Sequence, residues 1–109
     1  MYSRILRSLP REKAFYFFTS IGNYTGDSGA SLKEFLEKIC EVDVKSVEFH
    51  FHRGDFQKWI DEVLGDKELA TKVQALGNLG FSGTMLRNRL YNIVAQRYKE
   101  LTSGSNVEY

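Results

Sequence analysis

The sequence predicts an all-α fold, a compact bundle of five to six short helices with a longer C-terminal helix. Three observations support this fold class. Apolar residues recur at helical spacing in several segments, residues that cap helices precede these segments, and the last apolar stripe extends over about residues 82–102. The chain has 109 residues, of which 42% are hydrophobic, and this fits a single domain over residues 1–109. We expect residues 1–10 and 103–109 to fray.

Two segments admit either a helix or a strand. In "PREKAFYFFTSIG", Pro10 stands where helices often begin and Gly22 where they often end, while the aromatic residues favour a strand. In "SVEFHFHR", apolar and polar residues alternate as in a strand, yet Asp43 is a suitable N-cap for a helix. Because short strands need partners and the rest of the chain offers few, we favour helices for both. The alternative is an α+β fold with a small hairpin from residues 13–20 and 46–52.

A capping box marks the clearest helix. In "SLKE", the Ser31 hydroxyl can accept from the Glu34 amide while the Glu34 side chain reaches back. The apolar stripe behind this box consists of Leu32, Phe35, Leu36, Ile39 and Cys40. We interpret Cys40 as a small core residue rather than a nucleophile.

Three further stripes predict the remaining helices. The first follows Asp55 and ends at Gly65; it consists of Phe56, Trp59, Ile60, Val63 and Leu64. The second follows an N-cap at Asp66 and ends at Gly77; it consists of Leu69, Ala70, Val73 and Leu76. The long last helix has Leu86, Leu90, Ile93, Val94, Arg97 and Leu101 on one face, widened by Tyr91 and Tyr98.

Four residues in "HFHRGD" are candidates for catalysis. They are His50, His52, Arg53 and Asp55, and a histidine–aspartate pair among them could act in proton transfer. No nucleophile is marked out beside them, because no serine, threonine or cysteine stands in a turn that would expose it. The structural interpretation places both histidines at the border of a packed helix, with Gly54 ending that helix and Asp55 capping the next.

The same segment is a weak candidate for metal binding. In a strand, His50 and His52 share a face, whereas in a helix they diverge by about 200°. A zinc site needs three or four ligands, and the chain offers two histidines and one cysteine. We therefore expect neither a metal nor another cofactor.

Three residues are candidates for ligand binding. Thr25 and Gly26 lie in the glycine-rich "GNYTGDSGAS", which leads into a helix N-terminus and could bind an anion, although a plain turn is the favoured interpretation. Trp59 lies on an apolar stripe and is expected to anchor the core; if it were exposed, it would be a binding residue instead.

Charge is unevenly distributed along the chain. The net charge is +3 over residues 1–26, −5 over residues 27–69 and +3 over residues 70–109, and the pI is about 7.8. The last helix carries Arg87, Arg89, Arg97 and Lys99, which could contact nucleic-acid phosphates. Dedicated nucleic-acid binders have a pI above about 9, so we expect this helix to serve folding, with a homodimer through its broad apolar face as an open alternative.

The composition also indicates a compartment. A single cysteine excludes an internal disulfide, and no apolar run reaches the roughly 18 residues of a membrane span. The first residues lack the apolar core of a signal peptide. We expect a cytoplasmic protein without a membrane partner.

The segment "LKEFLEKICEVDVKSVEFHFHRGDFQKWIDEVLGDKELA" resembles DUF5752, a family of archaeal and bacterial proteins of unknown function. The resemblance covers about residues 13–98. Its motifs are Thr25-Gly26, a histidine followed by "RGDF", Trp59 and "LGDKELA". Members look helical through the histidine-to-tryptophan region, which favours a helix there. The family carries no activity to transfer, but some related domains stand near carbohydrate-active enzymes, which implies a role accessory to carbohydrate metabolism.

These observations favour a small non-catalytic module that binds an unknown protein or small ligand. The first alternative is a small enzyme that uses His50, His52, Arg53 and Asp55. The second is nucleic-acid binding through the basic C-terminal helix. A close cluster of the four residues in an open pocket would favour the enzyme, and a buried, hydrogen-bonded arrangement would favour the module.

Overall fold

The computed structural model describes residues 2–103 and is mostly helical, with one small β-hairpin. The N-terminal part contains α1 (Tyr2–Leu6), a 3₁₀ turn η1 (Arg11–Lys13) and the strands β1 (Phe15–Ser20) and β2 (Asn23–Gly29). The rest contains α2 (Leu32–Glu41), α3 (Val44–Arg53), α4 (Asp55–Trp59), the π-helical turn η2 (Ile60–Leu64), α5 (Lys67–Ala75), the 3₁₀ turn η3 (Leu76–Asn78) and α6 (Gly83–Ser103).

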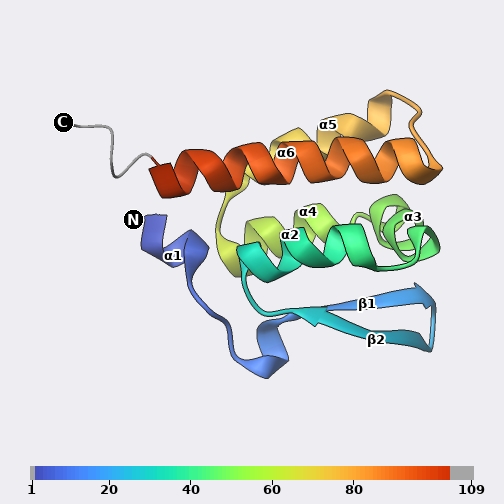
Figure 1. The fold of residues 1–109 in the computed structure, drawn as a ribbon, viewed down its shortest axis with the longest axis horizontal. Helices are drawn as coiled ribbons and strands as arrows, with labels where there is room; N and C mark the ends of the chain where they lie inside the picture. The colour runs from blue at the N-terminus through green and yellow to red at the C-terminus, as the bar shows by residue number, and fades with distance from the viewer. Residues whose placement is uncertain (1, 104–109) are drawn as a thin grey trace.

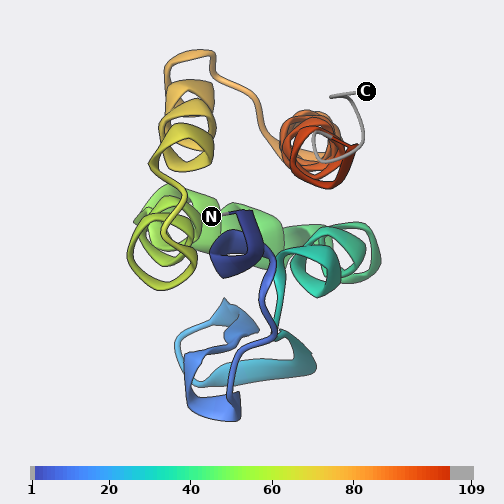
Figure 2. The ribbon, with the colours of Figure 1, turned by 90° about the vertical axis from the view of Figure 1, so that its left-hand side faces the viewer.

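The elements form three layers. The hairpin is one outer layer, α2, α3 and α4 form the middle layer, and α5 and α6 form the other outer layer (Figures 1 and 2). Helix α2 contacts both β2 and α6, and α3 contacts both β1 and α6. Helices α2 and α3 are therefore covered on both faces. One cluster of buried apolar side chains runs through all three layers, from Phe17 in β1 to Leu101 in α6.

The hairpin corrects the prediction of an all-α fold. Residues 15–20 form a strand rather than part of a helix, as the α+β alternative expected. The partner strand is residues 23–29, however, and residues 46–52 lie in α3, where a helix was favoured. Phe15 and Phe17 are buried while Tyr16 and Phe18 are partly exposed, so the period of two prevailed over the helical interpretation.

Strand β2 carries a bulge that its sequence disguises. Between the pairs Tyr16–Ser28 and Phe18–Tyr24, β2 advances by four residues while β1 advances by two. The Thr25 hydroxyl donates to the Phe17 carbonyl at 2.8 Å and accepts from the Asp27 amide at 3.1 Å. Gly26 has φ of 90°, which only glycine adopts without strain. The bulge explains why "NYTGDSG" shows no strand pattern.

Side-chain caps confirm most predicted helix starts. The Ser31 hydroxyl accepts a hydrogen bond from the backbone amide of Glu34. The Asp43 carboxylate accepts from the backbone amide of Lys45, and the Asp66 carboxylate from that of Leu69. Gly65 has φ of 83° and ends η2, as its position predicted. The N-cap of α4 corrects another expectation, because Gly54 occupies it and Asp55 is the first helical residue.

Cys40 is exposed, which corrects its interpretation as a core residue. It lies at the edge of the α2 stripe, next to the fully buried Ile39. The stripe of α2 therefore buries a narrower face than its apolar residues suggest.

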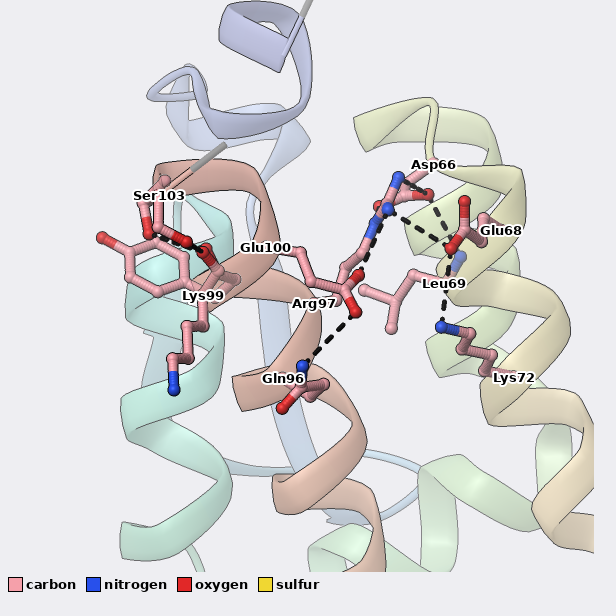
Figure 3. A network of polar contacts seen from close by, with 11 residues as sticks. Asp66, Glu68, Leu69, Lys72, Gln96, Arg97, Lys99, Glu100 and Ser103 are labelled. Atoms are coloured by element: carbon pink, nitrogen blue, oxygen red, sulfur yellow. Dashed lines mark hydrogen bonds and ion pairs between the residues drawn. The ribbon is translucent and has the colours of Figure 1, made fainter. Parts of the chain in front are cut away.

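A buried ion pair joins α5 and α6, the two helices of the second outer layer (Figure 3). The Asp66 carboxylate accepts from Arg97 Nε at 2.8 Å and from Arg97 Nη2 at 3.2 Å, and it also caps α5. The Asp66 side chain is 1% exposed and that of Arg97 is 12% exposed. Asp66, with further charge from Glu68 and Glu100, raises the pKa of Arg97. This pairing explains how an arginine can lie on the apolar face of α6.

The ends of the chain were expected to fray. Within residues 1–10, α1 packs near η2, Leu9 is buried, and Arg7 donates to the Val63 carbonyl at 2.7 Å. Residues 1 and 104–109 lie outside the described residues. Over residues 2–103, no helix combines the length and the apolar character needed to cross a membrane.

Candidate functional site

A pocket of about 360 Å³ lies where the hairpin meets the α3–α4 junction. We call it the hairpin pocket. It is lined by Phe15, Tyr16, Phe18, Ser20, Ile21, Gly22, Phe49, His50, Arg53 and Asp55. Its walls are mainly apolar, and its histidine and its two charged residues come from residues 50–55 at the α3–α4 junction. The volume is at the lower end of the range of roughly 300–1,000 Å³ that is usual for small-ligand sites.

His50 is held from two sides at the back of the hairpin pocket. Its Nε2 accepts the backbone N–H of Phe18 at 2.8 Å, and its Nδ1 lies 2.8 Å from Asp55 Oδ2. Because the Phe18 amide can only donate, Nε2 must be unprotonated, so Nδ1 carries the proton and donates to Asp55. The residue is 4% exposed. His50 therefore ties β1 to the α3–α4 junction.

Burial lowers the pKa of His50 below its ordinary value, and the hydrogen bond to Asp55 opposes this shift only in part. The bond from Phe18 acts in the same direction as burial, because a protonated Nε2 would face another donor. His50 is therefore a neutral side chain near pH 7.

This environment predicts a loss of stability in mild acid. The unfolded chain binds a proton on His50 as the pH falls through its ordinary pKa of about 6.5, while the folded chain resists protonation. The contribution of His50 to the free energy of unfolding is thus complete above that pH and declines as the pH falls below it. Urea denaturation at several pH values below about 6.5 should show a decline in the free energy of unfolding. The decline should be smaller in His50→Gln. It should be unchanged in His52→Gln, which replaces an exposed histidine. An equal decline in the His50→Gln variant would contradict this role.

Arg53 stands at the mouth of the hairpin pocket. Its Nε lies 3.3 Å from Asp55 Oδ2, and its guanidinium lies over the Phe49 ring, 4.9 Å from the centroid. Its side chain is 49% exposed, whereas that of Asp55 is 27% exposed. The aspartate is turned inward to His50, and the arginine faces solvent.

The fourth catalytic candidate lies apart. His52 is exposed and lines a different pocket, with Gln57 and Phe81 among its neighbours. Two residues that are two positions apart on a helix point about 200° away from each other. His50 and His52 therefore diverge, as the helical interpretation expected. The structure brings together His50, Arg53 and Asp55, and it does not add His52.

The three candidate ligand-binding residues, Thr25, Gly26 and Trp59, contribute to the fold itself rather than to the hairpin pocket. Thr25 and Gly26 form the bulge of β2, and neither lines the hairpin pocket. Trp59 is 7% exposed, and its indole N–H donates to the Lys13 carbonyl at 2.8 Å. The aromatic walls were not recognised as site residues from the sequence. The position of Phe49, four residues before Arg53 on one helix, was the available signal.

The described part of the chain contains no cluster of side chains that could hold a metal ion. Within residues 2–103, no three or more His, Cys, Asp or Glu side chains gather closely enough to hold a metal ion. The sequence-based expectation of a metal-free protein stays a prediction.

Three of the four basic candidates on α6, all but Lys99, have side-chain contacts within the fold. Arg87 donates to the carbonyls of Cys40 and Val42 at 2.9 and 2.7 Å, and so caps the end of α2. Arg97 pairs with Asp66, and the Arg89 guanidinium lies over the Phe81 ring. These contacts favour a folding role for the helix.

Comparison with known proteins gives one match. No curated protein and no solved structure matches the chain. The model of DUF5752, described as a family of unknown function, matches residues 10–108. This range contains the hairpin, the hairpin pocket and every helix from α2 to α6. The chain therefore belongs to family DUF5752, whose function is unknown.

Proposed function

We propose that the chain is a non-catalytic binding module, and that the hairpin pocket takes an apolar group of a partner protein or small ligand. The main support is the state of His50, since both of its ring nitrogens already have partners within the fold. A general base needs a nitrogen that can reach the substrate proton. With His50 occupied and His52 elsewhere, the cluster supports binding better than catalysis.

The character of the pocket supports the same proposal. Phe15, Phe18 and Phe49 supply aromatic walls, and Ile21 at the turn of the hairpin is 85% exposed beside them. Pockets with apolar walls and few polar groups are typical of sites that bind a ligand by burying its apolar surface. The role accessory to carbohydrate metabolism, nucleic-acid binding through α6 and self-association stay predictions.

The proposal is tested by titrating ¹⁵N-labelled protein with a small neutral aromatic fragment, benzyl alcohol. The expected amide shift changes concentrate on residues 16–22 and 49–55. Phe49→Ala removes one aromatic wall of the pocket, and a loss of about 1 kcal/mol, near that of one buried methylene group, should weaken binding roughly fivefold.

Phe81→Ala is the matched control, because Phe81 also lies under an arginine but outside the hairpin pocket. It should leave the affinity unchanged. Shift changes confined to other surfaces, or equal effects of the two substitutions, would reject the proposal.

A further inference from the structure

We propose that the hairpin pocket selects an apolar group that carries a carboxylate, and that Arg53 is the residue that recognises the carboxylate. This inference rests on the proposed function and names its ligand class. The carboxylate could belong to a free hydrophobic acid or to the C-terminal residue of a peptide. Both sources present the same chemistry to the pocket, a negative charge next to an apolar group.

The first support is the fixed position of the Arg53 guanidinium. Its central carbon lies over the Phe49 ring, and its Nε lies within ion-pair distance of Asp55 Oδ2. An arginine fixed by two contacts loses less conformational entropy on binding than a free one. The group is therefore prepared for a ligand although it lies at the surface.

The second support is the donor edge that these contacts leave. Within residues 2–103, neither Nη1 nor Nη2 of Arg53 donates a hydrogen bond, and the ion pair with Asp55 is made through Nε. These two nitrogens form the end of the guanidinium, which matches the two oxygens of a carboxylate in a bidentate pair. A single-point cation such as lysine would not impose this geometry.

The third support is the balance of charge at the pocket. Asp55 is the acidic residue of the lining, but its Oδ2 already accepts from His50 and lies beside Arg53 Nε. It is also less exposed than Arg53, at 27% against 49%. The charge that a ligand meets at the mouth is that of the arginine, so an anionic ligand is favoured over a cationic one.

The test compares phenylacetate with phenylacetamide, which share the ring but differ in charge. Dissociation constants come from amide shift changes in ¹⁵N-labelled protein. We expect the acid to bind about fivefold more tightly than the amide, since an exposed charge-assisted pair contributes modestly. Arg53→Gln should remove this preference. Arg89→Gln is the matched control, because Arg89 also lies over a phenylalanine ring at 4.9 Å, and it should retain the preference.

The outcomes separate this inference from the proposed function. If both compounds bind at the hairpin pocket with equal affinity, the carboxylate inference fails and the binding module stands. If neither shifts residues 16–22 and 49–55, the proposed function fails. A preference that persists in Arg53→Gln would overturn the role of Arg53.

The source of the carboxylate is resolved by a third ligand, the tripeptide Gly-Gly-Phe with a free C-terminus. Tighter binding of the tripeptide than of phenylacetate assigns the site to peptide C-termini. The reverse order assigns it to free acids. Both orders support the carboxylate inference, provided that the amidated tripeptide binds more weakly than the free one; equal binding of these two peptides would contradict it.

Discussion

Replacing Trp59 with alanine is expected to lower the free energy of unfolding by about 3–5 kcal/mol, the range for emptying a large buried aromatic site. The indole ring lies 5.1 Å from the Phe35 ring and 5.6 Å from the Phe15 ring, between centroids. Its N–H also satisfies the Lys13 carbonyl. The substitution therefore opens a cavity and removes the partner of a backbone acceptor.

Urea denaturation followed by circular dichroism measures this loss, because the variant lacks the only tryptophan. Trp59→Phe is the matched control. It keeps an aromatic ring and removes the hydrogen bond, so its loss should be clearly smaller. A loss below about 1 kcal/mol for Trp59→Ala, the size typical of an ordinary substitution, would show that the ring contributes little to the core.

Replacing Arg97 with alanine is expected to destabilise the protein by about 3–5 kcal/mol, because it leaves an unpaired charge in the interior. Asp66 is 1% exposed on its side chain and would lose both bonds from the guanidinium. Within residues 2–103, the hydrogen bond from the Leu69 amide at the start of α5 would remain to it. The effect comes from the stranded carboxylate more than from the attraction lost.

A second variant separates these contributions. Asp66→Asn keeps a side chain that can cap α5 and removes the buried charge, so Arg97→Ala should cost less in that background. Lys72→Ala, which breaks an exposed pair with Glu68, should cost less than about 1 kcal/mol. Equal costs of Arg97→Ala in both backgrounds would show that Asp66 and Arg97 are not energetically coupled.

The helices could be predicted from the sequence because their signals are local. Caps at Ser31, Asp43 and Asp66 and stops at Gly54 and Gly65 are set by neighbouring residues, and the structure has each of them. The hairpin could not be predicted in the same way. Its second strand contains a bulge that breaks the period of two, so the first strand had no recognisable partner nearby.

One part of the candidate site could likewise be predicted from the sequence, and the other part could not. His50, Arg53 and Asp55 lie within six residues, and the helix with its glycine stop brings them together. The opposite wall, with Phe15 and Phe18, depends on the packing of β1 against α3, which is a tertiary contact. The bond from Phe18 to His50, which decides the state of the histidine, has a sequence separation of 32 and no local signal.

His50 is a neutral structural residue, and we propose for that reason that the hairpin pocket binds a ligand rather than catalyses a reaction. The most direct test is imidazole NMR on ¹⁵N-histidine-labelled protein at pH 7, with His52→Gln used to assign the two rings. We predict a proton on Nδ1 of His50 and an unprotonated Nε2 that accepts a hydrogen bond. A His50 ring that is cationic, or that carries its proton on Nε2, would contradict the account.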